Sequence, residues 1–286
     1  MMTPRGMVRE TFDLRIPEGK ASEWLSPNDG TSLGGSVRKL LVRRDEPVVD
    51  VVREAQRHYR SLGSAFYLAW SVFRKYSKAE LANAAAFMLK PHPVEMAGEE
   101  YGTTYDEYVS CPLCGTGALQ TSPLTLACRR LPRKDFCRSL GWELIVSARV
   151  VRAFVDAGVT GVEFAPIICS ETGVASENWR QLVVSRHDVH IASPTEVGIG
   201  PFEEVSALTE KYECARGHLL GLNIISEASI DRNTWGDEDI AFSDQFIGIR
   251  RGLIRPHRVL FISPKVRAII ANENLTGTGL EVVHVV

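Results

Sequence analysis

Hydrophobic residues recur every three or four positions between Pro47 and Arg60, the spacing of one face of an α-helix. We therefore predict an amphipathic helix over these residues. The run from Ala65 to Phe73 is rich in aromatic and β-branched side chains and predicts a strand. Residues 36–98 consequently form an N-terminal segment that mixes helix and strand.

A second helix is expected to begin after Ser77. The Ser77 hydroxyl can accept a hydrogen bond from the Glu80 amide while the Glu80 carboxylate reaches back, which is the pattern of a capping box. The alanine-rich stretch that follows predicts a helix as far as Leu89, and Pro91 and Pro93 stop it.

Residues 1–35 contain many Pro, Gly and Ser residues and little periodicity, so we expect a loop or a flexible N-terminal arm. A boundary is placed near residue 98, before an acidic and aromatic linker. Residues 99–286 are then expected to form an α+β domain that carries the cysteine motif described below.

A seven-residue pattern occurs twice in this C-terminal domain. Leu144–Val150 recurs as Leu260–Val266, and each copy is followed at the same distance by Thr-Gly, at Thr160 and at Thr276. After the Thr-Gly pair, residues 162–164 match residues 280–282 if the second copy has two extra residues.

Each copy predicts a strand, a serine N-cap, a helix of about three turns and a second strand. The caps are Ser147 and Ser263, and Pro264 suits the first helical position. We therefore expect an α+β fold with two similar strand-helix-strand units, at residues 144–164 and 260–282. Duplication of one unit explains the pattern, and chance similarity is the alternative.

The sequence Cys111-Pro-Leu-Cys114-Gly115 has the spacing of a zinc knuckle, since two intervening residues let both sulfurs face one tetrahedral ion. The glycine permits the tight turn. We expect a structural zinc site of which this motif is one half, as in zinc ribbons. Redox catalysis by the pair is the weaker alternative, because the residues that follow favour a turn rather than the start of a helix.

The remaining zinc ligands must come from elsewhere in the chain. Cys214 and His218 are favoured, because a cysteine followed by Gly-His resembles the second turn of a zinc ribbon. The alternatives are Cys128 with Cys137, or a mixture of these residues. Cys128 and Cys137 have apolar neighbours, which is more typical of small buried side chains.

Composition narrows the possible functions. The 286 residues include 33 basic and 35 acidic side chains, so the net charge of -2 attracts neither nucleic acid nor an anionic membrane. No apolar run is long enough to cross a bilayer and the N-terminus has no secretion signal, so we expect a cytoplasmic protein. Six cysteines in a reducing compartment favour thiols or metal ligands over disulfides.

Four further segments carry polar side chains that could act in binding. His187 and His190 are expected to face solvent on a strand. The basic segment 250–258 could contact phosphates, but it lacks interleaved aromatic residues. Two acidic and aromatic segments, 101–108 and 235–244, could instead bind a basic protein partner. We find no motif that identifies a catalytic reaction.

The intact Cys111-Pro-Leu-Cys114-Gly115 motif, the later cysteine and Gly-His, and the Ser-basic-Val and Thr-Gly unit together resemble the bacterial double-CxxCG motif proteins. Some members of that family are regarded as immunity proteins, which protect a cell from a toxin delivered by a neighbouring cell. The second motif departs from the family pattern, since Arg216 replaces its second cysteine and His218 follows the glycine. The resemblance implies a toxin-binding protein without catalysis. The alternative is a zinc-containing enzyme or a nucleic-acid-associated factor that uses residues 250–258.

Overall fold

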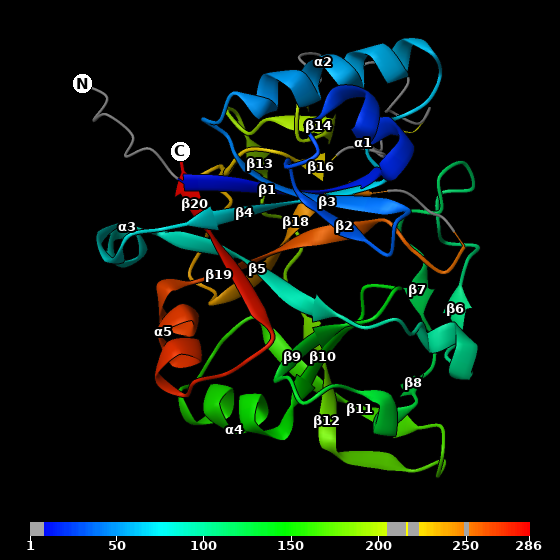
Figure 1. Cartoon of the computed structure of the whole chain (residues 1–286). Coiled ribbons are helices and arrows are strands. Elements are labelled where there is room, and N and C mark those ends of the chain that lie inside the picture. Colours follow the sequence, from blue (N-terminus) through cyan, green and yellow to red (C-terminus); the bar gives the residue numbers. More distant parts are fainter. Residues whose placement is uncertain (1–8, 205–215, 217–222, 249–251) are drawn as a thin grey trace. The chain divides into compact units, whose positions relative to one another are not determined.

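The computed structural model describes residues 9–204, 216, 223–248 and 252–286 (Figure 1). The chain divides into two compact units. The first contains the described residues up to Asn83 together with 198–204, and the second contains the other described residues. Both units combine helices with strands, and strands predominate, so the protein is a mixed α and β protein as predicted.

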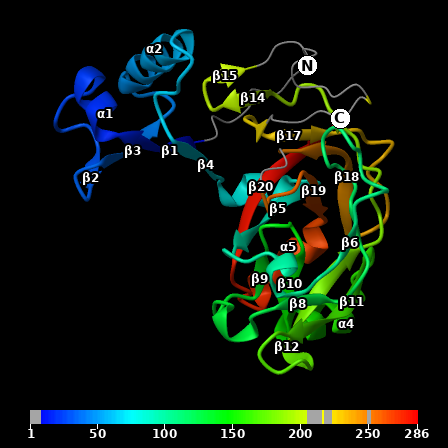
Figure 2. The ribbon, with the colours of Figure 1, turned by 90° about the vertical axis from the view of Figure 1, so that its right-hand side faces the viewer.

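The first unit is a four-stranded antiparallel sheet with two helices on one of its faces. The strands lie in the order β2-β3-β1-β4, which together with the helices gives the β-α-β-β-α-β sequence of ferredoxin-like folds. Figure 2 shows α1 and α2 on the same side of this sheet. Its elements are β1 (Arg9–Pro17), α1 (Glu18–Trp24), β2 (Thr31–Leu33), β3 (Val37–Arg43), α2 (Val48–Ser61) and β4 (Ala69–Lys75), followed by α3 (Lys78–Asn83).

The expectation of a loop or arm over residues 1–35 is wrong for residues 9–35, which form β1, α1 and β2. Phe12, Leu14 and Ile16 alternate with polar residues along β1 and are completely buried. This period of two is a strand signal. The Pro, Gly and Ser residues that follow obscured it, because they supply the turns between short elements.

Two features of residues 36–98 are confirmed. Helix α2 occupies the predicted region. The capping box is present, with the Ser77 N–H donating to Glu80 Oε2 at 2.6 Å and the Glu80 N–H donating to Ser77 Oγ at 3.2 Å.

The predicted helix to Leu89 is wrong, since α3 ends at Asn83 and residues 86–93 form strand β5 (Ala86–Pro93). Residues Ala86–Leu89 are buried throughout, and Met88 pairs with Phe261 on one side and Glu281 on the other. A strand that is buried on both faces is a continuous run of apolar residues. The hydrophobic periodicity of such a run does not distinguish it from a buried helix. The boundary between the units therefore lies at residue 83, before this strand, rather than near 98.

The second unit contains the largest sheet of the described residues, with eleven strands. Nine strands follow the order β13-β17-β20-β5-β9-β10-β12-β11-β8, and β19 joins β18 to β5. Its elements are η1 (Gly98–Tyr101), β6 (Tyr105–Asp106), β7 (Leu119–Gln120), β8 (Leu124–Leu126), η2 (Cys128–Arg130), β9 (Phe136–Arg138), β10 (Leu144–Ser147), α4 (Ala148–Asp156), β11 (Val162–Cys169), β12 (Ala175–Val184), β13 (Ile191–Ala192), β16 (Asn223–Ile224), β17 (Ala228–Ile230), β18 (Ile240–Ile247), β19 (His257–Ile262), α5 (Pro264–Asn272) and β20 (Thr278–Val285). Two short strands, β14 (Val197–Gly200) and β15 (Glu203–Glu204), pair with each other.

Residues 144–164 contain β10, α4 and the start of β11, and residues 260–282 contain the end of β19, α5 and most of β20. Each helix begins after a serine whose hydroxyl accepts the N–H three residues later, at 3.4 Å from Ser147 and 3.3 Å from Ser263. Val150 and Val266 are completely buried. Figure 1 shows the two helices beside each other.

Two buried aspartates connect these segments. Asp135 accepts hydrogen bonds from the Ser147 hydroxyl at 2.7 Å and from the Thr276 N–H at 2.8 Å. Asp239 accepts from the Ser263 hydroxyl at 2.8 Å and from the Thr160 N–H at 3.1 Å. Each carboxylate therefore holds the cap of one helix and the turn that follows the other helix.

Candidate functional site

Cys111 and Cys114 lie in the loop between β6 and β7, which pair as an antiparallel hairpin. The Cys111 N–H donates to the Thr116 carbonyl at 2.8 Å, and the Gly115 N–H donates to the Cys111 carbonyl at 2.7 Å. Gly115 has a φ of 70°, in the left-handed region. The chain therefore makes the tight turn that the motif predicted.

The two thiols differ in environment. Cys111 is only 3% exposed, whereas Cys114 is partly buried and its Sγ lies 3.1 Å from Thr116 Oγ1. The other predicted zinc ligands, Cys214 and His218, lie outside the described residues. The structure thus places one half of the predicted site and leaves the zinc prediction untested.

The alternative ligand pair Cys128 and Cys137 is ruled out as a pair in this structure, because Cys128 forms a disulfide with Cys169. No local sequence pattern joins these two residues, and the bridge stands in place of the thiols or metal ligands that the composition favours. Cys137 lies in β9 and is 1% exposed. Burial and then the charge of Asp135 raise the pKa of the Cys137 thiol to about 11, so it remains protonated in the core.

The knuckle loop, which we define as residues 107–118, is attached to the sheet by Arg255. This arginine is 7% exposed and pairs with Glu99 and, at 2.7 Å, with Glu107. Its guanidinium group also lies over the ring of Tyr105, 4.2 Å from the centroid. Burial alone would lower the pKa of Arg255, but the bonds to Glu107 and Glu99 outweigh it and raise the pKa.

The phenol of Tyr105 provides a second attachment. It donates to the buried carboxylate of Glu143, which also accepts from the Ser139 hydroxyl. Burial raises the pKa of Tyr105, and the neighbouring Glu143 raises it further. The phenol is therefore a permanent donor, and strand β6 is fixed at the base of the knuckle loop.

A stack of three side chains lies next to this network. The ring of His257 is parallel to that of Trp142 within 8°, and Arg138 lies over the same indole, 3.8 Å from its centroid. Burial, and then the charge of Arg138, hold the pKa of His257 well below its usual value. The imidazole is consequently neutral, and its Nδ1 is buried without a hydrogen-bond partner among the described residues.

The tip of the knuckle loop is apolar and exposed. Tyr108 is fully exposed, at 101%, and Val109 and Leu113 are 58% and 62% exposed. Large apolar side chains grouped on a surface loop often mark a protein-binding site. The arrangement of a rigid base and an exposed apolar tip is therefore suited to binding another molecule.

Among the described residues of the basic segment 250–258, the arginines are engaged within the fold rather than free to bind a ligand. Arg250 and Arg251 lie outside the described residues. Arg255 is paired as above, and Arg258 donates to the carbonyls of His187, Ser243 and Asp244. Arg255 and Arg258 therefore serve the fold rather than a phosphate backbone.

The acidic stretch around Trp235 is not one continuous surface. Asp239 is 8% exposed and belongs to the network at Ser263, and Trp235 is partly buried and packs against the core. Asp239 is therefore engaged inside the fold, and binding of a basic partner by this segment stays a prediction. Asp237 is exposed, and His190 is half exposed and pairs with Asp244 at 2.9 Å.

Sequence reasoning missed the network of Glu99, Glu107, Tyr105, Glu143 and Arg255. Arg255 lies 148 residues from Glu107, so no local spacing connects them. The signal in the sequence is the density of acidic and aromatic residues between 99 and 108, a stretch whose composition alone indicates a linker.

No helix among the described residues has both the length and the apolar character needed to span a membrane.

In the searches of protein families and of curated proteins, no family model matches the sequence and no protein matches it.

Proposed function

We propose that this chain is a non-catalytic, zinc-stabilised binding protein, and specifically an immunity protein that neutralises a bacterial toxin in the cytoplasm. The observation that carries the binding role is the knuckle loop, whose tip exposes Tyr108, Val109 and Leu113 while Arg255 fixes its base. The toxin as partner comes from the resemblance to the double-CxxCG motif proteins.

Zinc would complete the rigidity of the loop. Cys111 and Cys114 stand on one tight turn, and Cys214 and His218 would supply the other two ligands. Four protein ligands make a closed structural site. Because the free energy of zinc binding is folding free energy in such sites, the metal would fix the loop before a partner arrives.

A loop that is rigid before binding loses little conformational entropy when it binds. Exposed tyrosine is among the side chains that contribute most at protein interfaces, so Tyr108 is the expected anchor. The acidic residue next to it, Asp106, favours a partner with a basic surface by speeding association.

The test is a binding measurement with a partner captured from the native cell. Tyr108→Ala and Leu113→Ser should speed dissociation from the partner, each weakening binding by about tenfold or more. Leu62→Ser provides the matched control, because Leu62 is similarly exposed, at 65%, but lies at the end of α2. If the loop variants bind and protect as well as the control does, the loop is not the interface.

The rival function is a zinc-containing enzyme or a nucleic-acid-associated factor. The internal pairing of Arg255 and Arg258 argues against the nucleic-acid form. Retention of the protein on nucleic acid that weakens steeply with salt would favour the rival, since that dependence reports phosphate contacts.

We also propose that residues 144–164 and 260–282 are equivalent units that arose by duplication. The strand registers support this: Ile145 pairs with Gln181 and Phe261 pairs with Met88. On its other edge, Gln181 pairs with Ala165, and Met88 in the same way pairs with Glu281.

The two registers determine how the copies align. They make Ala165 equivalent to Glu281, and these two residues are as far apart along the chain as Ser147 and Ser263 are. In this alignment the second copy has no extra residues, so no insertion after Gly277 is needed. In the duplicated unit, β12 follows the first copy in the chain, whereas β5 precedes the second.

A further inference from the structure

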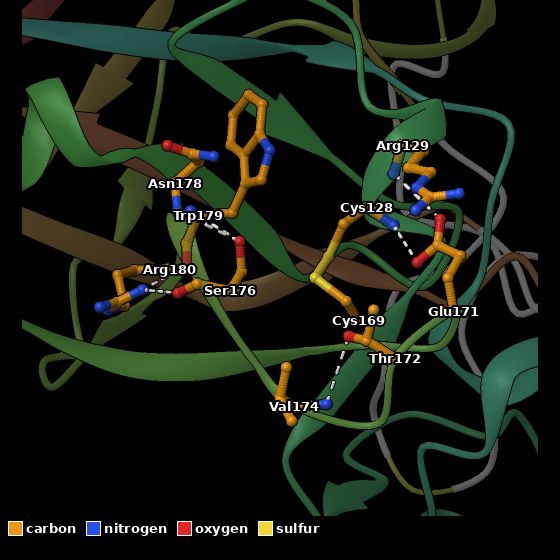
Figure 3. Close-up of a disulfide and its surroundings, with 10 residues drawn as sticks. All are labelled: Cys128, Arg129, Cys169, Glu171, Thr172, Val174, Ser176, Asn178, Trp179 and Arg180. Atoms are coloured by element: carbon orange, nitrogen blue, oxygen red, sulfur yellow. Dashed lines mark hydrogen bonds between the residues drawn. A yellow bond between two sulfur atoms is a disulfide. The ribbon is translucent and has the colours of Figure 1, made fainter.

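The disulfide between Cys128 and Cys169 joins two neighbouring strand ends. Cys128 follows β8, and Cys169 is the last residue of β11, which runs parallel to β8 with Cys169 opposite Leu126. Both sulfur-bearing residues are partly exposed. Figure 3 shows the bond between them and the side chain of Glu171 beside it.

Glu171 is held in place against this pair. One carboxylate oxygen accepts the Cys128 N–H at 3.1 Å, and the other accepts the Arg129 N–H at 3.0 Å (Figure 3). A carboxylate oxygen of Glu171 and the two sulfurs all lie within 4.8 Å of one another.

We propose that Cys128, Cys169 and Glu171 form a metal site when the disulfide is reduced, and that the site binds one zinc ion. Zinc with bonds of about 2.0–2.3 Å holds its ligand atoms less than about 4.6 Å apart. The observed grouping therefore needs only small side-chain movements. Two thiolates and one carboxylate are ligands that zinc accepts, and they leave the fourth tetrahedral position for water.

The disulfide form and the zinc form interconvert by reduction followed by metal binding. A dithiol reductant gives two electrons and two protons to the disulfide, which becomes two thiols while the reductant becomes a disulfide. Zinc then displaces the two thiol protons and binds the resulting thiolates. In a reducing compartment the metal form would predominate. A small-molecule disulfide would reverse the exchange: it takes two electrons from the thiolates and two protons from water and becomes two thiols, while the Cys128–Cys169 bond re-forms and zinc is released.

This site is separate from the knuckle at Cys111 and Cys114, and it stands whether or not the chain binds a toxin. The full-length protein is prepared in two samples, one oxidised and one reduced by a phosphine that does not bind zinc tightly. Both are equilibrated with zinc, freed of excess metal by gel filtration and analysed for zinc per chain. The reduced sample should hold one zinc more than the oxidised sample.

Variants locate the additional ion. The double substitution C128S/C169S should abolish the difference between the samples, and Glu171→Gln should weaken binding of the additional zinc on the order of tenfold or more. Glu177→Gln is the matched control, since Glu177 is exposed on the adjacent strand β12. Equal zinc content in the oxidised and reduced wild-type samples would overturn the proposal. An additional ion that persists in C128S/C169S would do the same.

Discussion

The carboxylate of Asp135 accepts hydrogen bonds from both the backbone N–H and the hydroxyl of Thr276, 141 residues further along the chain. Asp239 accepts the corresponding pair of bonds from Thr160. A basic side chain accompanies each carboxylate, Arg149 at 3.1 Å from Asp135 and Lys265 at 2.8 Å from Asp239. Each buried anion thus accepts hydrogen bonds from a serine, a threonine and a basic side chain, so removal of its charge would leave buried donors without their acceptor.

We predict that Asp135→Asn and Asp239→Asn each lower the free energy of unfolding by about 1–3 kcal/mol, because each leaves buried donors without an anionic acceptor. Urea titration of the purified variants measures this. Asp237→Asn is the control, since Asp237 is exposed, and should change stability by less than about 0.5 kcal/mol. Equal stability of all three variants would show that the two networks contribute nothing.

The same aspartates predict an acid dependence. Burial raises the pKa of each carboxyl group, but the bonds that Asp135 receives from Thr276 and Ser147 and those that Asp239 receives from Lys265 and Ser263 outweigh burial and lower both pKa values. A group whose pKa is lower in the folded state stabilises above its unfolded pKa, about 3.9, and loses that contribution as the pH falls further. The asparagine variants should therefore lose less stability between pH 5 and pH 3 than the wild type does.

Substitutions at two glycines should be costly for a steric reason. A Cβ at Gly161 would lie 2.2 Å from the Ile240 carbonyl oxygen, and one at Gly277 would lie 2.3 Å from that of Phe136. Both glycines have a positive φ, as Gly158 also has, but no atom lies within 4 Å of a Cβ at Gly158. Gly158→Ala should cost about 1–2 kcal/mol. Thermal melting should show at least twice that loss for Gly161→Ala and Gly277→Ala, since their neighbouring backbone must move.

Stability should also depend on pH through His257. Its pKa is lowered in the folded state by burial, so the unfolded chain takes up a proton that the folded chain excludes. Above about pH 6.5 the imidazole is neutral in both states, so this residue does not lower the free energy of unfolding. As the pH drops below that value, the free energy of unfolding falls by up to about 1.4 kcal/mol per pH unit. His257→Phe keeps an aromatic ring against Trp142 and should flatten the dependence. A profile between pH 7 and pH 5 that is identical in the variant and the wild type would contradict this assignment.

The zinc prediction remains to be measured on the protein itself. Elemental analysis of oxidised protein should find one tightly bound zinc per chain, and Cys111→Ser or Cys114→Ser should remove it and markedly lower the melting temperature. Cys137→Ser is the control, since Cys137 is a buried thiol in β9 that would not bind the metal. Protein that is free of zinc and melts at the same temperature in both knuckle variants would exclude a structural metal there.

The amino-acid sequence by itself determined the local features. The serine caps of α4 and α5, the capping box at Ser77 and the tight turn at Gly115 all depend on residues within a few positions of one another. Their hydrogen bonds close over short loops, so residue type and spacing are sufficient to predict them.

Only the tertiary structure decided which distant residues meet. Residues 86–89 became a central strand because β19 and β20 cover both of its edges, and Cys128 met Cys169 because β8 and β11 are neighbours. Arg255 reached Glu107 across 148 residues for the same kind of reason. Such contacts depend on strand order and register, which long-range packing sets and a local pattern does not contain.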